Sequence, residues 1–176
     1  MALTLIKEDG TGKVDANSYA SAADGDAFHD GHLYASAWTA ATLANKETAL
    51  VMATRLIDGQ FQFGGAKSND AQALQWPREG CHDPDADGWN GGTVASNVVP
   101  KSVFEATCEM ARELLIVDRT AAPEGEGLKY ENTGTTQKGY DKNDSRPVIS
   151  RVAQAMLAKY GTPLNRKGGV VRLVRS

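Results

Sequence analysis

Several residue types that build catalytic and metal sites are scarce in this chain. It has two cysteines, Cys81 and Cys108, and three histidines, His29, His32 and His82. Two thiols make no disulfide framework, and stable zinc sites take three or four protein ligands, for which no clustered set is evident. No phosphate-binding glycine loop, nucleophile elbow or HExxH pattern occurs. These absences predict no enzyme activity, no cofactor and no metal.

Long apolar runs are missing too, and aromatic residues make up only 7% of the chain. No stretch approaches the roughly 20 apolar residues that span a bilayer, so we expect no membrane partner. Binding of single-stranded nucleic acid uses aromatic platforms beside basic residues, whereas Trp38, Trp76 and Trp89 do not alternate with basic residues. The 176 residues, 41% of them hydrophobic, fit one globular domain with its own core.

Charge is divided unevenly between the two parts of the chain. The formal net charge is −3, from 19 basic and 22 acidic residues. Residues 145–176 contain seven of the basic residues and no Asp or Glu, which leaves +7 on this segment and −10 on the first 144 residues. The pattern fits two interpretations equally well. One is a solvated basic tail, and the other is a tail that docks on an acidic protein surface or on nucleic acid.

Hydrophobic periodicity and capping residues predict about four helices, over residues 22–33, 46–56, 100–117 and from Arg146-Pro147 to Tyr160. Ser21 with Asp24 forms a capping box for the first helix, which Phe28 and Leu33 would hold against the core. Residues 2–8 favour a short strand. Residues 128–142 favour an extended arm or a loose hairpin with a turn near Asn132, or else a flexible loop.

We therefore predict a mainly α fold, a bundle of about four helices with a short β-hairpin or extended arms and a flexible C-terminal tail. Residues 1–162 would form the single domain, with a protruding loop at about 76–100 and an arm at about 121–144. Residues 163–176 would be the basic tail. Trp76-Pro77 and Val99-Pro100 restrict the backbone on both sides of the loop, which predicts a rigid base and a polar tip at residues 83–92.

Two acidic patterns are candidate sites. Asp83, Asp85 and Asp87 have the spacing that opens a calcium loop, but the closing Glu at the twelfth position is Val94, which favours an acidic turn. On the third expected helix, Glu105, Glu109 and Glu113 recur every four residues on its outer face. This stripe is either a solvated face or a subunit interface that meets basic residues of a neighbouring copy. His29 and His32 are expected at the surface.

The order of these segments resembles a family of tailed-bacteriophage proteins. The similar segments are an N-terminal Glu8 to Gly12, Ala16 to Ser21, Lys46 to Thr54, Gln72 to Arg78, and Val99-Pro100 opening a helix. Together they resemble proteins labelled DnaT-like single-stranded DNA-binding proteins, and they are also similar to head–tail connector adaptors. The resemblance covers residues 5–118, and the last 58 residues are similar only in layout.

This resemblance implies a virion protein of the phage neck, assembled in the host cytoplasm as a homo-oligomeric ring, commonly a dodecamer, beneath the portal protein. The ring would extend the channel through which genomic DNA passes without sequence-specific binding, and would join a downstream neck or tail protein. The family lends no catalytic residues. The portal-binding segment would be the tail, through these residues: Arg166, Lys167, Val171, Arg172, Leu173, Val174 and Arg175. The alternative is a replication accessory protein that binds single-stranded DNA.

Overall fold

The computed structural model describes residues 3–86, 91–122, 130–133, 136–139 and 146–164. These residues form five helices: α1 (Ala22–His29), α2 (Ser36–Thr39), α3 (Leu43–Gln60), α4 (Lys101–Ile116) and α5 (Arg151–Leu157). They also form eight short strands: β1 (Phe61–Phe63), β2 (Ala66–Lys67), β3 (Arg78–Glu79), β4 (His82–Asp83), β5 (Gly92–Thr93), β6 (Tyr130–Thr133), β7 (Thr136–Gly139) and β8 (Gly161–Pro163). The predicted mainly α bundle of four helices is wrong, because the fold mixes helices with several small antiparallel sheets.

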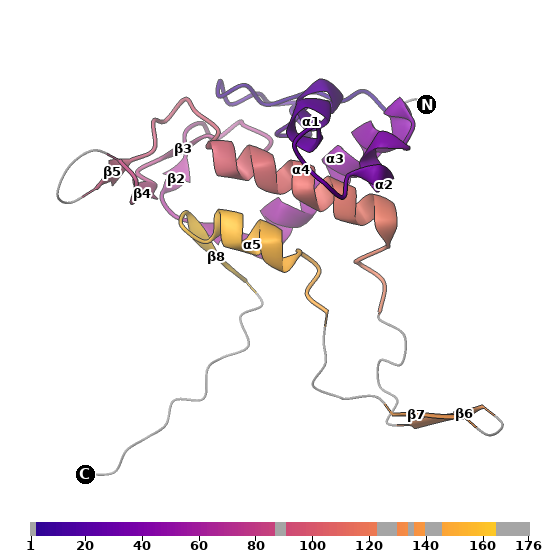
Figure 1. Cartoon of the computed structure of the whole chain (residues 1–176). Coiled ribbons are helices and arrows are strands. Elements are labelled where there is room, and N and C mark those ends of the chain that lie inside the picture. Colours follow the sequence, from indigo (N-terminus) through magenta and orange to yellow (C-terminus); the bar gives the residue numbers. More distant parts are fainter. Residues whose placement is uncertain (1–2, 87–90, 123–129, 134–135, 140–145, 165–176) are drawn as a thin grey trace, which may run out of the picture.

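Helix α4 is the centre of the body, as Figure 1 shows: α3 and α5 pack against it, and α1 and α2 also contact it. Its buried side chains include Val103, Cys108 and Met110, each without exposed surface. The predicted range of 100–117 matches this helix closely, with Pro100 as its N-cap residue. The strong apolar stripe explains why sequence periodicity located α4 well.

The other helices begin or end away from their predicted bounds. The capping box of Ser21 and Asp24 is present, but α1 ends at His29 instead of extending to residue 33. Helix α3 is longer than predicted, because Thr42 caps it and Gly59 continues it. Helix α5 begins after Ser150, whose side chain accepts a hydrogen bond from the N–H of Ala153. Residues 3–8 contribute only an isolated bridge between Lys7 and Ser18 instead of a strand.

The small sheets account for the error in fold class. Each consists of two strands of two to four residues, too short to show an alternating pattern in the sequence. Strand β1 pairs antiparallel with β8, so that Phe61 faces Pro163 about a hundred residues later. Strand β2 pairs with β3, which begins the loop predicted to protrude, and β4 pairs with β5 within that loop. The pairing of β1 with β8 joins segments far apart in the chain, and such pairing leaves no pattern in the local sequence.

Buried carboxylates organise the polar interior of the N-terminal half. Glu8 is buried, and its side chain accepts hydrogen bonds from the N–H groups of Gly10, Gly12 and Lys13 at 2.8–2.9 Å. Both glycines have positive φ, which turns the backbone around the carboxylate. Asp58 accepts from the hydroxyl of Tyr19 at 2.6 Å, and burial raises the pKa of Asp58 to about 6.

We expect the substitution Glu8→Gln to lower the free energy of unfolding by about 2 kcal/mol, because an amide nitrogen in place of Oε2 would face the N–H of Lys13 and leave a buried donor unpaired. Urea denaturation followed by circular dichroism would measure the change. The matched control is Glu79→Gln, at an exposed position, with an expected effect within about 0.5 kcal/mol. Equal stability of the two variants would contradict the role of Glu8.

The predicted arm contains a β-hairpin, since β6 pairs antiparallel with β7 in register from Tyr130 opposite Gly139 to Thr133 opposite Thr136. In Figure 1 this hairpin lies well apart from the helical body, below the ends of α4 and α5. An isolated two-stranded hairpin is marginally stable in water. Contact with a further surface would therefore stabilise this hairpin.

Candidate functional site

The acidic stripe predicted on α4 is largely neutralised within the chain. Glu109 is only 3% exposed, and its carboxylate lies 2.6 Å from the guanidinium of Arg112. Arg112 also pairs with Glu113 at 2.7 Å, and Glu105 pairs with Lys101 at 3.4 Å. The expectation that all three glutamates lie on an outer face is wrong for Glu109, because a buried arginine one turn away draws it inward. Their role at a subunit interface stays a prediction.

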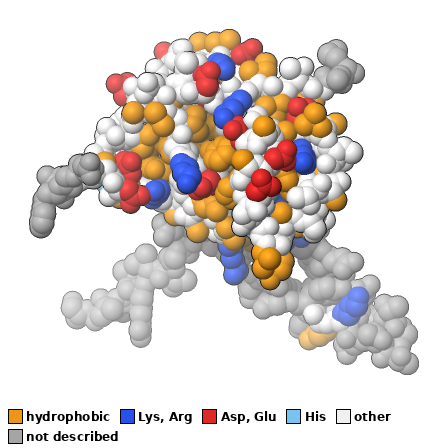
Figure 2. All heavy atoms as spheres, turned by 45° about the horizontal axis from the view of Figure 1, so that its top comes forward, with side chains coloured by type: hydrophobic (Ala, Val, Ile, Leu, Met, Phe, Trp, Pro, Cys, Tyr) orange, Lys and Arg blue, Asp and Glu red, His pale blue; other side chains and the backbone are white. Residues whose placement is uncertain are grey.

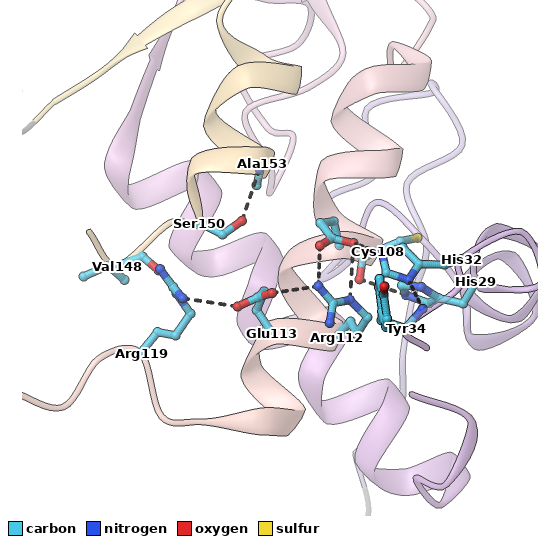
Figure 3. Close-up of polar contacts among 11 residues, drawn as sticks. His29, His32, Tyr34, Cys108, Arg112, Glu113, Arg119, Val148, Ser150 and Ala153 are labelled. Atoms are coloured by element: carbon cyan, nitrogen blue, oxygen red, sulfur yellow. Dashed lines mark hydrogen bonds and ion pairs between the residues drawn. The ribbon is translucent and has the colours of Figure 1, made fainter. Parts of the chain in front are cut away.

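The same network continues to the root of the arm, as Figure 3 shows. Glu113 accepts from Arg119 at 3.2 Å. Arg119 donates to the carbonyl oxygens of Val148 at 2.9 Å and Pro147 at 2.7 Å, on the segment that returns from the arm. We call these contacts of Arg119 the arm clamp. It joins the segment that follows α4 to the segment that precedes α5.

Two histidines attach the connection between α1 and α2 to α4. His29 is buried between Phe28 and Trp38, and its Nε2 lies 3.2 Å from the carbonyl oxygen of Cys108. Its Nδ1 is buried without a hydrogen-bond partner. Nε2 of His32 lies 3.7 Å from Glu109. The expectation of two surface histidines is wrong for His29, because burial between two aromatic rings depends on a tertiary contact.

Burial lowers the pKa of His29 below its ordinary value of 6.5. The folded protein therefore binds fewer protons here than the unfolded chain, and the stability that neutral His29 provides is present above pH 6.5 and is lost as the pH falls below it. We expect the stability advantage of the natural protein over a His29→Gln variant to shrink between pH 7.5 and pH 5. Urea denaturation at each pH measures this difference, and a constant advantage would contradict it.

The Trp76-Pro77-Arg78 passage is architectural in the structure. Arg78 is buried, and its guanidinium donates to the carbonyl oxygens of Phe63, Gly64, Gly65 and Gln75 and to the side chain of Gln75. Trp76 has no exposed surface and packs edge-on against Phe63 and Tyr160. The side chains of this motif thus hold β1 and β3 together and do not face solvent.

Most basic side chains in the described part of the chain are bound to carboxylates of the body. Lys7 pairs with Asp24, Lys46 with Asp26, and Lys159 with Asp85. On the face drawn in Figure 2, acidic and basic side chains lie side by side among hydrophobic ones. A basic groove lined by stacked aromatic rings, the usual platform for single-stranded nucleic acid, does not occur among the described residues.

The chain matches one protein-family model over residues 3–176, and the description of that family is "Putative DnaT-like ssDNA binding protein". The chain belongs to this DnaT-like family. The match includes the last 58 residues, beyond the range 5–118 over which the sequence shows specific similarity. No curated protein and no solved structure gave a match to the chain.

In this DnaT-like family member, the remaining candidate sites are the acidic turn at residues 83–87 and the thiol of Cys108. Within the described residues, no three His, Cys, Asp or Glu side chains gather closely enough to hold a metal ion. Asp83 lies in β4, Asp85 pairs with Lys159, and Asp87 lies outside the described residues. Burial raises the pKa of the Cys108 thiol to about 12, which leaves it protonated and inert.

A cleft of about 480 Å³ separates the N-terminal segment from the segment before α4. Lys7 and Asp9 lie on one wall, Val98 on the other, and Lys101 and Phe104 of α4 complete the lining. Both lysines are engaged with carboxylates, Lys7 with Asp24 and Lys101 with Glu105. The cleft of this family member therefore offers no unpaired cation that would select an anionic ligand.

The predicted portal-binding residues of this family member, Arg166 to Arg175, lie outside the described residues, so their role stays a prediction. In the described part of the chain, no helix has the length and apolar character to cross a membrane. Sequence reasoning missed Leu33 and Tyr34, which are 85% and 74% exposed. Leu33 was expected to pack against the core, and the early end of α1 places it in the connection to α2 instead.

Proposed function

We propose that this protein is a structural adaptor that assembles into a ring beneath the portal of a phage capsid and joins it to the neck or tail. The observation that carries the proposal is the arm: a hairpin apart from the body, on segments that Arg119 clamps to residues 147 and 148. A hairpin that branches from two segments joined by Arg119 is suited to contact neighbouring molecules.

The distribution of polar groups also supports an assembly role. Arg112 and Arg119 are committed to Glu109, Glu113 and backbone carbonyls within the chain, while several large apolar side chains, such as Leu33 and Tyr34, remain exposed. Exposed aromatic and aliphatic side chains mark protein–protein contacts. Lys7 and Lys101, the two cations in the described lining of the cleft, are both paired with carboxylates, so the cleft itself offers a nucleic-acid backbone no unpaired cation.

Electron microscopy of the full-length protein, alone and mixed with a portal protein of the same virus, tests the proposal. We expect closed rings, either alone or on the portal. The matched variant is Arg119→Ala, which removes the arm clamp and should reduce the fraction of closed rings, while a control at the exposed Arg55 should leave it unchanged. A persistent monomer that never joins the portal would overturn the adaptor function.

A second candidate function is binding of single-stranded DNA, which membership of the DnaT-like family favours. The segment 145–176 would carry it, because its seven basic residues have no acid among them. A mobility-shift assay with short oligonucleotides at 50 and 200 mM salt separates the two functions. Phosphate binding must weaken steeply with salt, so a strong salt-sensitive shift by a monomer supports DNA binding, whereas rings that give no shift exclude it.

A further inference from the structure

Exposed apolar side chains gather at one end of the body, where the α1–α2 connection, the start of α3 and the end of α4 meet. Figure 1 shows α2 beside the last turns of α4, and α3 begins four residues after α2. We call this surface the apolar end, and its members are Leu33, Tyr34, Leu43, Ile116 and Val117, all of them exposed. Single exposed apolar residues are ordinary, but five on adjoining segments indicate a contact surface.

The two most exposed members of the apolar end are held in place by the body. His32 fixes the connection, because its Nδ1 accepts from the N–H of Tyr34 at 3.1 Å while its Nε2 lies 3.7 Å from Glu109 of α4. His29, three residues earlier, is anchored at the carbonyl of Cys108. A partner that binds Leu33 and Tyr34 therefore meets side chains on a fixed backbone, and little conformational entropy is lost on binding.

Three of the charged residues that border the apolar end and remain at the surface are acidic, and one is basic, the exposed Arg146, which donates to the carbonyl oxygen of Asp118 at 3.0 Å. Asp30 and Asp118 are exposed and Glu47 is half-buried. The basic side chains nearest to them in the sequence are bound within the chain: Lys46 to Asp26, Arg112 to Glu109 and Glu113, and Arg119 to Glu113. We call Asp30, Glu47 and Asp118 the acidic rim. The surface thus suits a partner that combines apolar side chains with cations.

We propose that the apolar end binds the C-terminal residues 165–176 of a second copy of this chain. That segment has the complementary composition. It contains four basic residues and no acid, with aliphatic side chains between them: Arg166, Lys167, Val170, Val171, Arg172, Leu173, Val174 and Arg175. The aliphatic residues contact the apolar end, and the arginines face the acidic rim.

The positions of the two surfaces favour a second copy over the same chain. The C-terminal segment starts after Leu164, whose N–H donates to the carbonyl of Gln60 at the last residue of α3. The apolar end includes Leu43 at the first residue of α3. An 18-residue helix is about 27 Å long. To reach the apolar end of its own copy, the C-terminal segment would therefore have to extend along the whole of α3, past the exposed Arg55. Between copies the contact is head-to-tail, the arrangement that closes rings.

This inference rests on the proposed self-assembly and changes one expectation within it. The expected role of the tail was contact with the portal, whereas the apolar end and the acidic rim point to contact with the neighbouring copy. The two proposals fail separately. Rings that form on the portal with an altered apolar end overturn the present inference and leave the adaptor function standing. Copies that join through this contact but never bind a portal do the reverse.

The experiment uses the full-length chain and two variants, each of which lacks one half of the contact. Leu33→Ser with Tyr34→Ser removes the centre of the apolar end, and a stop after Leu164 removes the tail. Light scattering coupled to size-exclusion chromatography should show oligomers for the natural chain and monomers for each variant. A 1:1 mixture of the variants should give dimers but nothing larger, because one intact contact remains. Val152→Ser, also exposed, is the control and should assemble normally.

A synthetic peptide of residues 165–176 gives a second measurement. It should bind the chain that ends at Leu164 at micromolar concentration, at least tenfold more weakly when Leu33 and Tyr34 are replaced by serine, and more weakly as salt rises. Normal assembly of the double-serine variant would overturn the proposal, as would a peptide that does not bind. A natural chain that stays monomeric while its shortened form binds the peptide would show that the tail occupies its own copy, and would also overturn it.

Discussion

The substitution Arg78→Ala is expected to lower the free energy of unfolding by about 4–5 kcal/mol, close to the total stability of many domains. The guanidinium makes five hydrogen bonds, to four backbone carbonyls and one side-chain oxygen. Hydrogen bonds to a charged group contribute about 1.5–3 kcal/mol each when measured singly, and acceptors left buried without a donor add a penalty. Equilibrium unfolding in urea, monitored by circular dichroism, measures the loss.

Two further variants separate the role of Arg78 from that of positive charge. Arg78→Lys keeps the charge, but its single Nζ has three donors and cannot reach all five acceptors around the guanidinium, so we expect an intermediate loss of about 2–3 kcal/mol. Arg55→Ala removes an exposed arginine of α3 and should change stability by no more than about 0.5 kcal/mol. If Arg78→Ala unfolds at the same urea concentration as Arg55→Ala, the hydrogen bonds from the guanidinium to the carbonyls of residues 63–65 do not stabilise the fold.

The substitution Gly25→Ala is expected to destabilise the protein by about 3 kcal/mol, although alanine favours helices over glycine by about 1 kcal/mol. An added Cβ would lie 2.4 Å from Cζ2 and 2.7 Å from Cη2 of Trp38, which has no exposed surface. The indole is held by a hydrogen bond from its Nε1 to Asp26 at 2.8 Å and cannot withdraw without losing it. The close packing of α1 against this ring therefore requires glycine.

A second glycine in a helix supplies the matched control for Gly25. Gly59 lies in α3 with no atom within 4 Å of an added Cβ, so Gly59→Ala should stabilise the protein by about 0.5–1 kcal/mol. Thermal unfolding of the two variants should thus shift in opposite directions. A rise in melting temperature for both would mean that Trp38 yields to the extra methyl group, and the packing argument for Gly25 would fail.

Sequence reasoning predicted the elements whose signals are local. The broad apolar stripe and Pro100 defined α4 nearly to the residue, and the capping box of Ser21 defined the start of α1. Residues 128–142 favoured an extended arm, a loose hairpin or a flexible loop, and the structure shows the β6–β7 hairpin there. In each case the pattern lies within fewer than twenty consecutive residues, where period and capping are decisive.

The features that sequence reasoning missed depend on contacts between distant residues. The pairing of Phe61 with Pro163, the burial of Glu109 beside Arg112 and the packing of His29 on Trp38 arise only when the helices have come together. The candidate site also combines local and long-range features. The basic tail could be recognised from the charges in the sequence, whereas the apolar end could be recognised only once the structure had placed three separate segments side by side.

The pairing of β1 with β8 also sets an order of events during synthesis. Phe61 to Phe63 leave the ribosome about a hundred residues before Gly161 to Pro163, and Tyr160, which packs on Trp76, comes just before those partners. The core of the growing chain is therefore incomplete until the last strand emerges. Residues 165–176 follow that strand directly, so the segment we assign to the next copy is released only after the fold that precedes it can close.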